Sequence, residues 1–322
     1  MTNVLKNKET KTEPKSAAYI ARRYRKIIAH LIATWKGGSG KTKTAQLMSE
    51  TALAAGWSLR VIDTDTSNKV GHGIADCYDG SEIHVLDPND NVSDEGRTLL
   101  VEEFGRIFDE AANVTPENVE KPIHVIIDVA AEAAFKIIGI LTIDGILDRL
   151  TAEGHEVNWI VPITGATSSH ARITDYVAEL SEGGPCEHYN MRGYIVLDPS
   201  NGANLSAAAA DRSMAFNMSR DFPMWKGSAE ERAVSASPRW EVVELPPLTS
   251  ARAYLLYLAA TGKSPMTLGE FRTATGEDMI PREQGAIQRW LARTGPVLRA
   301  MMERQTPKFL RQQQQPAPAD VA

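Results

Sequence analysis

The segment from Trp35 to Thr42, Trp-Lys-Gly-Gly-Ser-Gly-Lys-Thr, contains the residue types that bind phosphate groups. Glycines let successive backbone N–H groups turn toward phosphate oxygens, and the positive end of a following helix adds to the attraction. Lys41 would neutralise the β- and γ-phosphates of a nucleotide, and the Thr42 hydroxyl would ligate Mg²⁺. We therefore predict a nucleotide-binding loop. Its expected contacts come from Gly37, Gly38, Ser39, Gly40, Lys41, Thr42 and Lys43.

Two apolar segments farther along the chain end in carboxylates. Val61-Ile62 is followed by Asp63-Thr64-Asp65, and Val125-Ile126-Ile127 is followed by Asp128. Because side chains alternate along a strand, Asp63 and Asp65 would lie on the same side. Ligands bind at the carboxyl edge of parallel sheets, which is where these residues would lie. The alternative for Asp63 and Asp65 is a capped strand end whose carboxylates are merely solvated.

The elements that must position these residues are read from the hydrophobic pattern. The run 27–34 is continuous and β-prone, as in a strand buried on both faces, and 44–55 has helical spacing and ends before Gly56. With a second strand at 58–63, this makes a strand–loop–helix–strand unit, which implies parallel pairing. Further segments complete the pattern: strands at 123–128, 157–163 and 193–198, a short strand at 83–87, and helices at 94–112 and 250–261.

This alternation predicts an α/β fold with a doubly wound, mostly parallel sheet and helices on both faces. We expect a P-loop domain over 26–262 and a small helical C-terminal appendix over 263–311. The flanking segments are expected to be disordered, a basic leader over 1–25 and a Gln/Pro/Ala tail over 312–322.

Composition excludes several classes of protein. The chain of 322 residues has no uncharged stretch long enough for a membrane span, and its N-terminus lacks the apolar core of a signal peptide. Its two cysteines, Cys77 and Cys186, cannot form a disulfide framework, which favours a reducing, cytoplasmic setting. Residues 1–26 carry a charge of +6 and the rest −12, which indicates contact with nucleic acid or another acidic surface. A solvated leader is the alternative.

The loop Lys36-Gly37-Gly38-Ser39-Gly40-Lys41-Thr42 resembles the deviant Walker A signature, KGGxGK[ST], of the ParA/MinD group of P-loop ATPases, in the SIMIBI class. The resemblance implies ATP and Mg²⁺ as cofactors and an ATP-dependent homodimer. It also implies that Lys36 reaches the partner's bound phosphates as a catalytic group beside Lys41. Trp35 departs from the strict Walker A pattern, which begins with glycine.

The same resemblance assigns roles to residues outside the loop. It implies that Asp63 supports the Mg²⁺ shell through water, that Asp65 positions the attacking water, and that Asp128 is a Walker B carboxylate near the metal. Asp198 stands where the family often has an asparagine that reads adenine, so it could accept a hydrogen bond from an exocyclic amine. Pro246 belongs to a proline loop that resembles the one beside the base.

This chain also departs from the family pattern in two segments that would act as switches. Thr66 and Ser67 replace the usual Pro-Gln after the aspartate pair, and Val129-Ala130-Ala131 replaces a loop that senses the γ-phosphate. We therefore expect the switch segments to behave differently here from those of the family.

The expected function is that of a dimerising ATPase that positions DNA or another cargo, as in plasmid partition or conjugation, with a cargo adaptor or ATPase-stimulating protein as partner. The segment after Asp128 is similar to the plasmid TraL/MobD/StbB-like branch. The alternative is a nucleotide-gated adaptor that recruits a protein or membrane partner with little ATP turnover. Non-specific DNA binding, with nucleoid association, would use the leader and a basic C-terminal set: Arg289, Arg293, Arg299, Arg304, Lys308 and Arg311.

Overall fold

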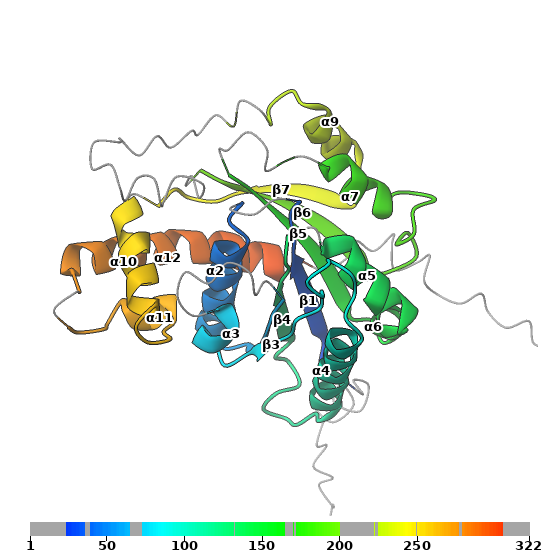
Figure 1. The fold of residues 1–322 in the computed structure, drawn as a ribbon, viewed down its shortest axis with the longest axis horizontal. Helices are drawn as coiled ribbons and strands as arrows, with labels where there is room; N and C mark the ends of the chain where they lie inside the picture. The colour runs from blue at the N-terminus through cyan, green and yellow to red at the C-terminus, as the bar shows by residue number, and fades with distance from the viewer. Residues whose placement is uncertain are drawn as a thin grey trace, which may run out of the picture.

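A computed structural model describes residues 24–35, 39–64, 73–131, 133–164, 170, 172–199, 222, 225–248, 250–276 and 279–304. Within them, seven strands form one sheet in the order β3-β2-β4-β1-β5-β6-β7, and every neighbouring pair is parallel (Figure 1). The strands are β1 (Ile27–Ile32), β2 (Ser58–Asp63), β3 (Ser81–Glu82), β4 (Ile123–Asp128), β5 (Glu156–Thr164), β6 (Met191–Asp198) and β7 (Trp240–Glu244). The predicted fold class is confirmed.

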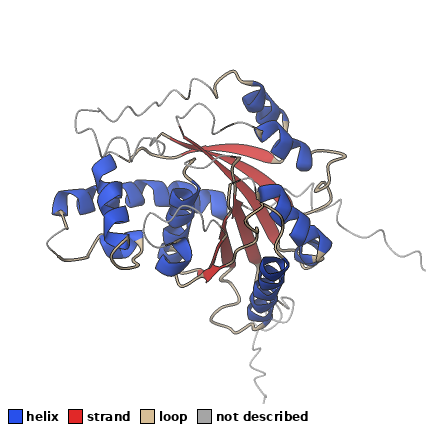
Figure 2. Ribbon diagram, in the orientation of Figure 1, coloured by secondary structure: helices blue, strands red, loops and turns tan. Residues whose placement is uncertain are grey.

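Helices cover both faces of the sheet (Figure 2). On one face lie α2 (Lys41–Ala54), α3 (Ile74–Cys77), α10 (Ala251–Thr261), α11 (Leu268–Phe271) and α12 (Pro281–Met302). On the other lie α4 (Asp94–Ala112), α5 (Ala134–Ile143), α6 (Ile146–Ala152), α7 (Ile173–Glu179) and α9 (Ala229–Ala236). Each helix layer encloses its own apolar core against the sheet. Every residue of β1, β4 and β5 is buried, as expected for central strands of a parallel sheet.

Several local predictions hold with small changes at the boundaries. Helix α4 matches the expected 94–112, and Ser93 caps it by accepting a hydrogen bond from the Gly96 N–H. Helix α2 ends at Ala54, and Gly56 follows in the left-handed conformation at φ +70°, as a glycine C′ residue should.

One strand prediction was wrong, and one strand was missed. The expected strand at 83–87 is not formed; the short strand β3 precedes it, and Leu86 instead makes an isolated antiparallel bridge to Val92. Strand β7 was not expected. It packs its Trp240 ring over Gly193 of β6, where a Cβ would come within 2.2 Å of the ring, so only glycine fits beneath the indole.

The C-terminal helix α12 packs against α2 and α10 on the same sheet face. Its Trp290, Leu298 and Met302 are fully or nearly fully buried there, and the Trp290 ring meets Tyr254 of α10 edge to face. The helical segment expected after residue 263 therefore contributes to the core that covers α2. No helix in these described ranges is both long and apolar enough to cross a bilayer.

Candidate nucleotide-binding site

The glycine-rich loop lies between β1 and α2, at the carboxyl edge of the central strand. The hydroxyls of Thr34 and Ser39 are 2.5 Å apart and hydrogen-bonded, so they join the two ends of the loop. Gly40, at φ +92°, directly precedes α2, and a Cβ there would lie 3.4 Å from Thr164 Cγ2. The backbone conformation therefore requires glycine. No side chain caps this helix terminus, and no acidic residue occupies its first turn, so the terminus suits an anion.

The first turn of α2 places three side chains with different surroundings. Lys41 and Lys43 are buried, with 5% and 4% of their surface exposed, whereas Thr42 is exposed. An exposed hydroxyl next to the loop can ligate a cation that a bound phosphate brings with it. A buried ammonium group interacts strongly with phosphate because little water screens it.

Two of the predicted carboxylates lie side by side. Asp63 ends β2 and Asp128 ends β4, and the parallel register pairs them directly. Both are buried, with 5% and 1% exposed. Asp63 Oδ2 accepts a hydrogen bond of 3.1 Å from the Ile74 N–H at the start of α3. Gly73 makes that approach possible, because a Cβ at this position would lie 2.6 Å from the same oxygen.

The loop after β4 is fixed to the end of β2. The Thr64 hydroxyl donates to the Asp128 carbonyl oxygen at 3.0 Å and accepts from the Ala130 N–H at 3.1 Å. This pair of bonds ties the segment that follows Asp128 to the segment that follows Asp63. The backbone segments that carry the two carboxylates are thus held together at one edge of the sheet.

The donor set fits Mg²⁺ bound together with a nucleotide. Mg²⁺ usually keeps several waters and takes one or two carboxylates plus phosphate oxygens, rather than a cage made only of protein groups. Accordingly, the described part of the chain holds no cluster of three or more His, Cys, Asp or Glu that could bind a metal alone. Thr42, Asp63 and Asp128 would supply one hydroxyl and two carboxylates beside the loop.

Asp198, the residue expected near the base, ends β6 and forms an ion pair with Lys43 of α2. Both side chains are almost fully buried, at 1% and 4% exposed, and the Lys43 ammonium group lies 5.9 Å from the centre of the Trp290 ring. The pair therefore ties the first turn of α2 to the end of β6. Sequence reasoning placed both residues at the site but did not foresee that they would contact each other.

Pro246 lies just beyond β7, at the same edge of the sheet. The preceding residue, Leu245, donates its N–H to the Leu197 carbonyl at 2.9 Å, which places the proline loop beside the end of β6. The Trp290 indole N–H donates to the Pro246 carbonyl at 3.1 Å. Helix α12 therefore holds this loop in place. The remaining predicted residues, Lys36, Gly37, Gly38 and Asp65, lie outside the described residues.

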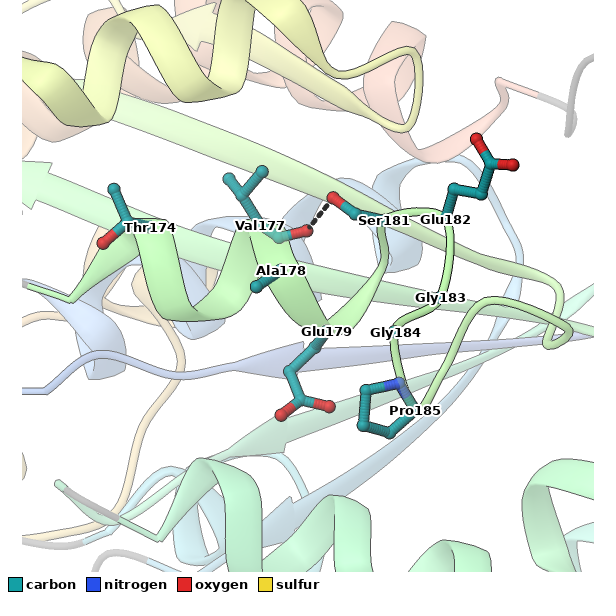
Figure 3. Close-up of a pocket in the computed structure, with 9 residues that line it drawn as sticks. All are labelled: Thr174, Val177, Ala178, Glu179, Ser181, Glu182, Gly183, Gly184 and Pro185. Atoms are coloured by element: carbon teal, nitrogen blue, oxygen red, sulfur yellow. Dashed lines mark hydrogen bonds between the residues drawn. The ribbon is translucent and has the colours of Figure 1, made fainter.

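A separate hollow of about 540 Å³ lies along the C-terminal end of α7 and the following turn (Figure 3). Residues 181–185 and the last turn of α7 line it, and the Ser181 hydroxyl donates to the Val177 carbonyl oxygen at 2.6 Å. Burial raises the pKa of Glu179 on its wall. None of the residues predicted to bind nucleotide contributes to this hollow.

Comparisons with known proteins find distant structural similarity. No family model matches the chain, and no curated protein matches it. A solved structure of the MinD cell division protein of Aquifex aeolicus aligns at 14% identity and a TM-score of 0.37, covering 88% of this chain and 98% of that one. A ParA family ATPase from Chlorobium tepidum aligns at 12% identity and a TM-score of 0.37, covering 84% and 98%. The fold assignment therefore rests on the strand order and the loop, not on these alignments.

Proposed function

We propose that this chain is an ATPase of the ParA/MinD type, which dimerises on ATP and positions DNA or another cargo. The observation that supports the proposal best is the set of residues at the carboxyl edge of the sheet. A glycine-dependent loop follows β1 and opens α2, and two register-paired carboxylates end β4, which neighbours β1, and β2, which neighbours β4. The deviant Walker A sequence of the loop adds Lys36, whose family role is to act across the dimer.

The residues of the chain divide the work between binding and turnover. Lys41 and the N–H groups at the start of α2 hold the phosphates, and Thr42, Asp63 and Asp128 hold the cation. When bound, Mg²⁺ would offset phosphate charge. Lys36 and Asp65 act on the transition state more than on the bound substrate, since one counters developing charge and the other orients water. The Asp198 carboxylate already pairs with Lys43, so a base amine would compete with the Lys43 ammonium group for it.

Steady-state ATP hydrolysis tests the proposal, with Lys36→Ala and Asp65→Ala as variants. Both are expected to bind ATP and to lose turnover. We expect Asp65→Ala to accumulate an ATP-bound dimer and Lys36→Ala to weaken that dimer, as measured by light scattering after size exclusion. Unchanged turnover in either variant would contradict the role assigned to that residue. Wild-type binding without turnover, with or without DNA, would favour the nucleotide-gated adaptor instead.

The DNA part of the proposal is supported by the exposed face of α12. Arg289 and Arg293 lie four residues apart and are both exposed, as are Arg282 and Arg299. The acidic Glu303 pairs with Arg299 at 2.8 Å, so it offsets one of these charges. Arginines that share a helix face can contact successive phosphates. Arg304 pairs with Glu241, whereas Lys308, Arg311 and the basic leader lie outside the described residues.

A further inference from the structure

An arginine directly before α7 lies over two aromatic rings, one of which adjoins the glycine-rich loop. The guanidinium carbon of Arg172 is 4.3 Å from the centre of the Trp35 ring and 5.8 Å from the centre of the Phe135 ring. Its Nε donates to Asp175 Oδ2 at 2.7 Å, which orients the guanidinium plane. Cations over aromatic faces are attracted to the ring quadrupole, and arginine also stacks on the ring.

The two rings belong to segments that follow two neighbouring strands, β1 and β4, at the edge where the nucleotide is proposed to bind. Trp35 ends the turn after β1 and is followed directly by Lys36. Phe135 lies in the first turn of α5, the helix that follows Asp128. Phe135 is itself packed, with its ring centre 5.2 Å from Tyr176 and 5.6 Å from Trp159. Arg172 therefore connects the start of the loop to an aromatic cluster anchored in the core.

The backbone of Arg172 indicates what its side chain contributes. Arg172 precedes α7 with φ at +66°, in the left-handed region that disfavours residues with a long side chain and suits glycine. Glycine at this position would relax the backbone and remove the guanidinium group. A purely structural role for the position would therefore be filled at least as well by glycine.

We propose that Arg172 is a positioning residue for the glycine-rich loop. It holds Trp35 against α5, and so fixes the residue that directly precedes Lys36 in the sequence. This inference rests on the proposed function, because it assigns the stack a part in ATP turnover. Lys41 is carried by α2 and does not depend on the stack. Loss of Arg172 should therefore spare binding in the ground state and reduce turnover, which depends on how accurately Lys36 is placed.

The decisive variant is Arg172→Gly. We expect kcat to fall about fivefold, the Kd for ATP to stay within about twofold, and the melting temperature to stay the same or rise. Arg172→Lys keeps the charge without the planar stack and should recover only part of the turnover. Trp35→Leu should give the same defect, and the double variant should be no worse than either single one.

Arg149→Ala is the matched control, since Arg149 also lies over a ring, 3.8 Å from the centre of Phe108, and belongs to α6 rather than to the loop or α7. Its turnover should equal that of the wild type. Wild-type turnover in Arg172→Gly would overturn the proposal, and so would additive defects in the double variant. A joint fall in binding, turnover and melting temperature would assign Arg172 a structural role instead.

Tryptophan fluorescence provides a readout that does not depend on hydrolysis. The emission of Trp35, isolated as the difference between wild type and Trp35→Phe, should change on addition of ATP. Acrylamide should quench the Trp35 emission more strongly in Arg172→Gly than in the wild type, because the Trp35 ring is then more accessible. If the wild type binds ATP without turning it over, the proposed ATPase fails while this measurement still tests the stack. Unaltered quenching in Arg172→Gly would overturn the inference alone.

Discussion

Lys41 combines a charge with burial at the start of α2, and this combination makes one strong prediction. Replacing it by alanine removes a charge-assisted contact to phosphate from a site with little water. We expect Lys41→Ala to weaken ATP binding about a hundredfold or more in calorimetry. Lys121→Ala, which removes an exposed lysine near the start of β4, should bind like the wild type. Comparable affinity in Lys41→Ala would rule out the phosphate-binding loop.

The buried Lys43–Asp198 pair gives a second prediction at this scale. Asp198→Asn leaves the Lys43 ammonium group buried without its carboxylate, which should lower the free energy of unfolding by about 3–5 kcal/mol in urea titrations. The double variant Lys43→Met/Asp198→Leu should recover most of that loss. Asp144→Asn is the control, because its partner Arg97 is 41% exposed, and it should cost about 1 kcal/mol or less. Equal losses in the two single variants would contradict this account.

At the scale of elements, three central strands carry an unusual buried polar row. His30 Nε2 of β1 lies 2.9 Å from His124 Nδ1 of β4, and the Asn158 amide of β5 lies 3.3 Å from His30 Nδ1. Trp57 stacks on His124 with the ring centres 4.3 Å apart. Burial lowers the pKa of His124 to about 3 and lowers the pKa of His30 well below its usual value. Both imidazoles are therefore neutral in the folded state.

These lowered pKa values predict how stability depends on pH. Unfolding exposes imidazoles whose pKa is about 6.5, so below that pH the unfolded chain binds more protons than the folded one. Stability should therefore fall as the pH drops from about 6.5 toward 3, by about 2 kcal/mol from His124 between pH 7 and 5, and His30 should add to this fall. Urea titrations at both pH values measure this change. His124→Phe should reduce it, whereas His84→Gln, which alters an exposed histidine, should not.

The same scale shows how much the sequence could predict. Strands β1 and β4 were predicted because largely apolar runs bounded by loops have few other structures available. Strand β7, Trp-Glu-Val-Val-Glu, is only five residues long and lacks a regular alternation, and its Trp240 packs over Gly193 of β6, which is distant in the chain. The position of Asp63 and Asp128 could be predicted, because each residue ends an apolar segment that was predicted to be a strand. The Lys43–Asp198 and Arg172–Trp35 contacts could not be predicted, because they join side chains from elements whose packing no local pattern encodes.

For the whole molecule, the exposed arginines of α12 predict DNA binding that depends on nucleotide and salt. Dimerisation would pair two such faces and double the phosphate contacts. We expect binding in the presence of ATP and loss of it with ADP, in anisotropy titrations at two salt concentrations. Arg289→Ala/Arg293→Ala should reduce the slope of log K against log salt by about 2 per protomer.

Arg106→Ala is the control for this measurement, since it removes an exposed arginine of α4 in the opposite helix layer. It should leave the slope unchanged. Absence of binding at about 50 mM salt with ATP would remove DNA from the proposal and leave a protein or membrane partner as the cargo.

The contact between α12 and α2 has a consequence for synthesis of the chain. Helix α2 follows the loop directly. The residues that cover it, Trp290, Leu298 and Met302, belong to α12, which is translated last among the described elements. While the chain is still on the ribosome, the apolar side of α2 is a surface on which a chaperone can act. A nascent chain stalled before Pro281 should hold nucleotide poorly, and release of the full chain should restore it. Competence for ATP would thus depend on the synthesis of α12.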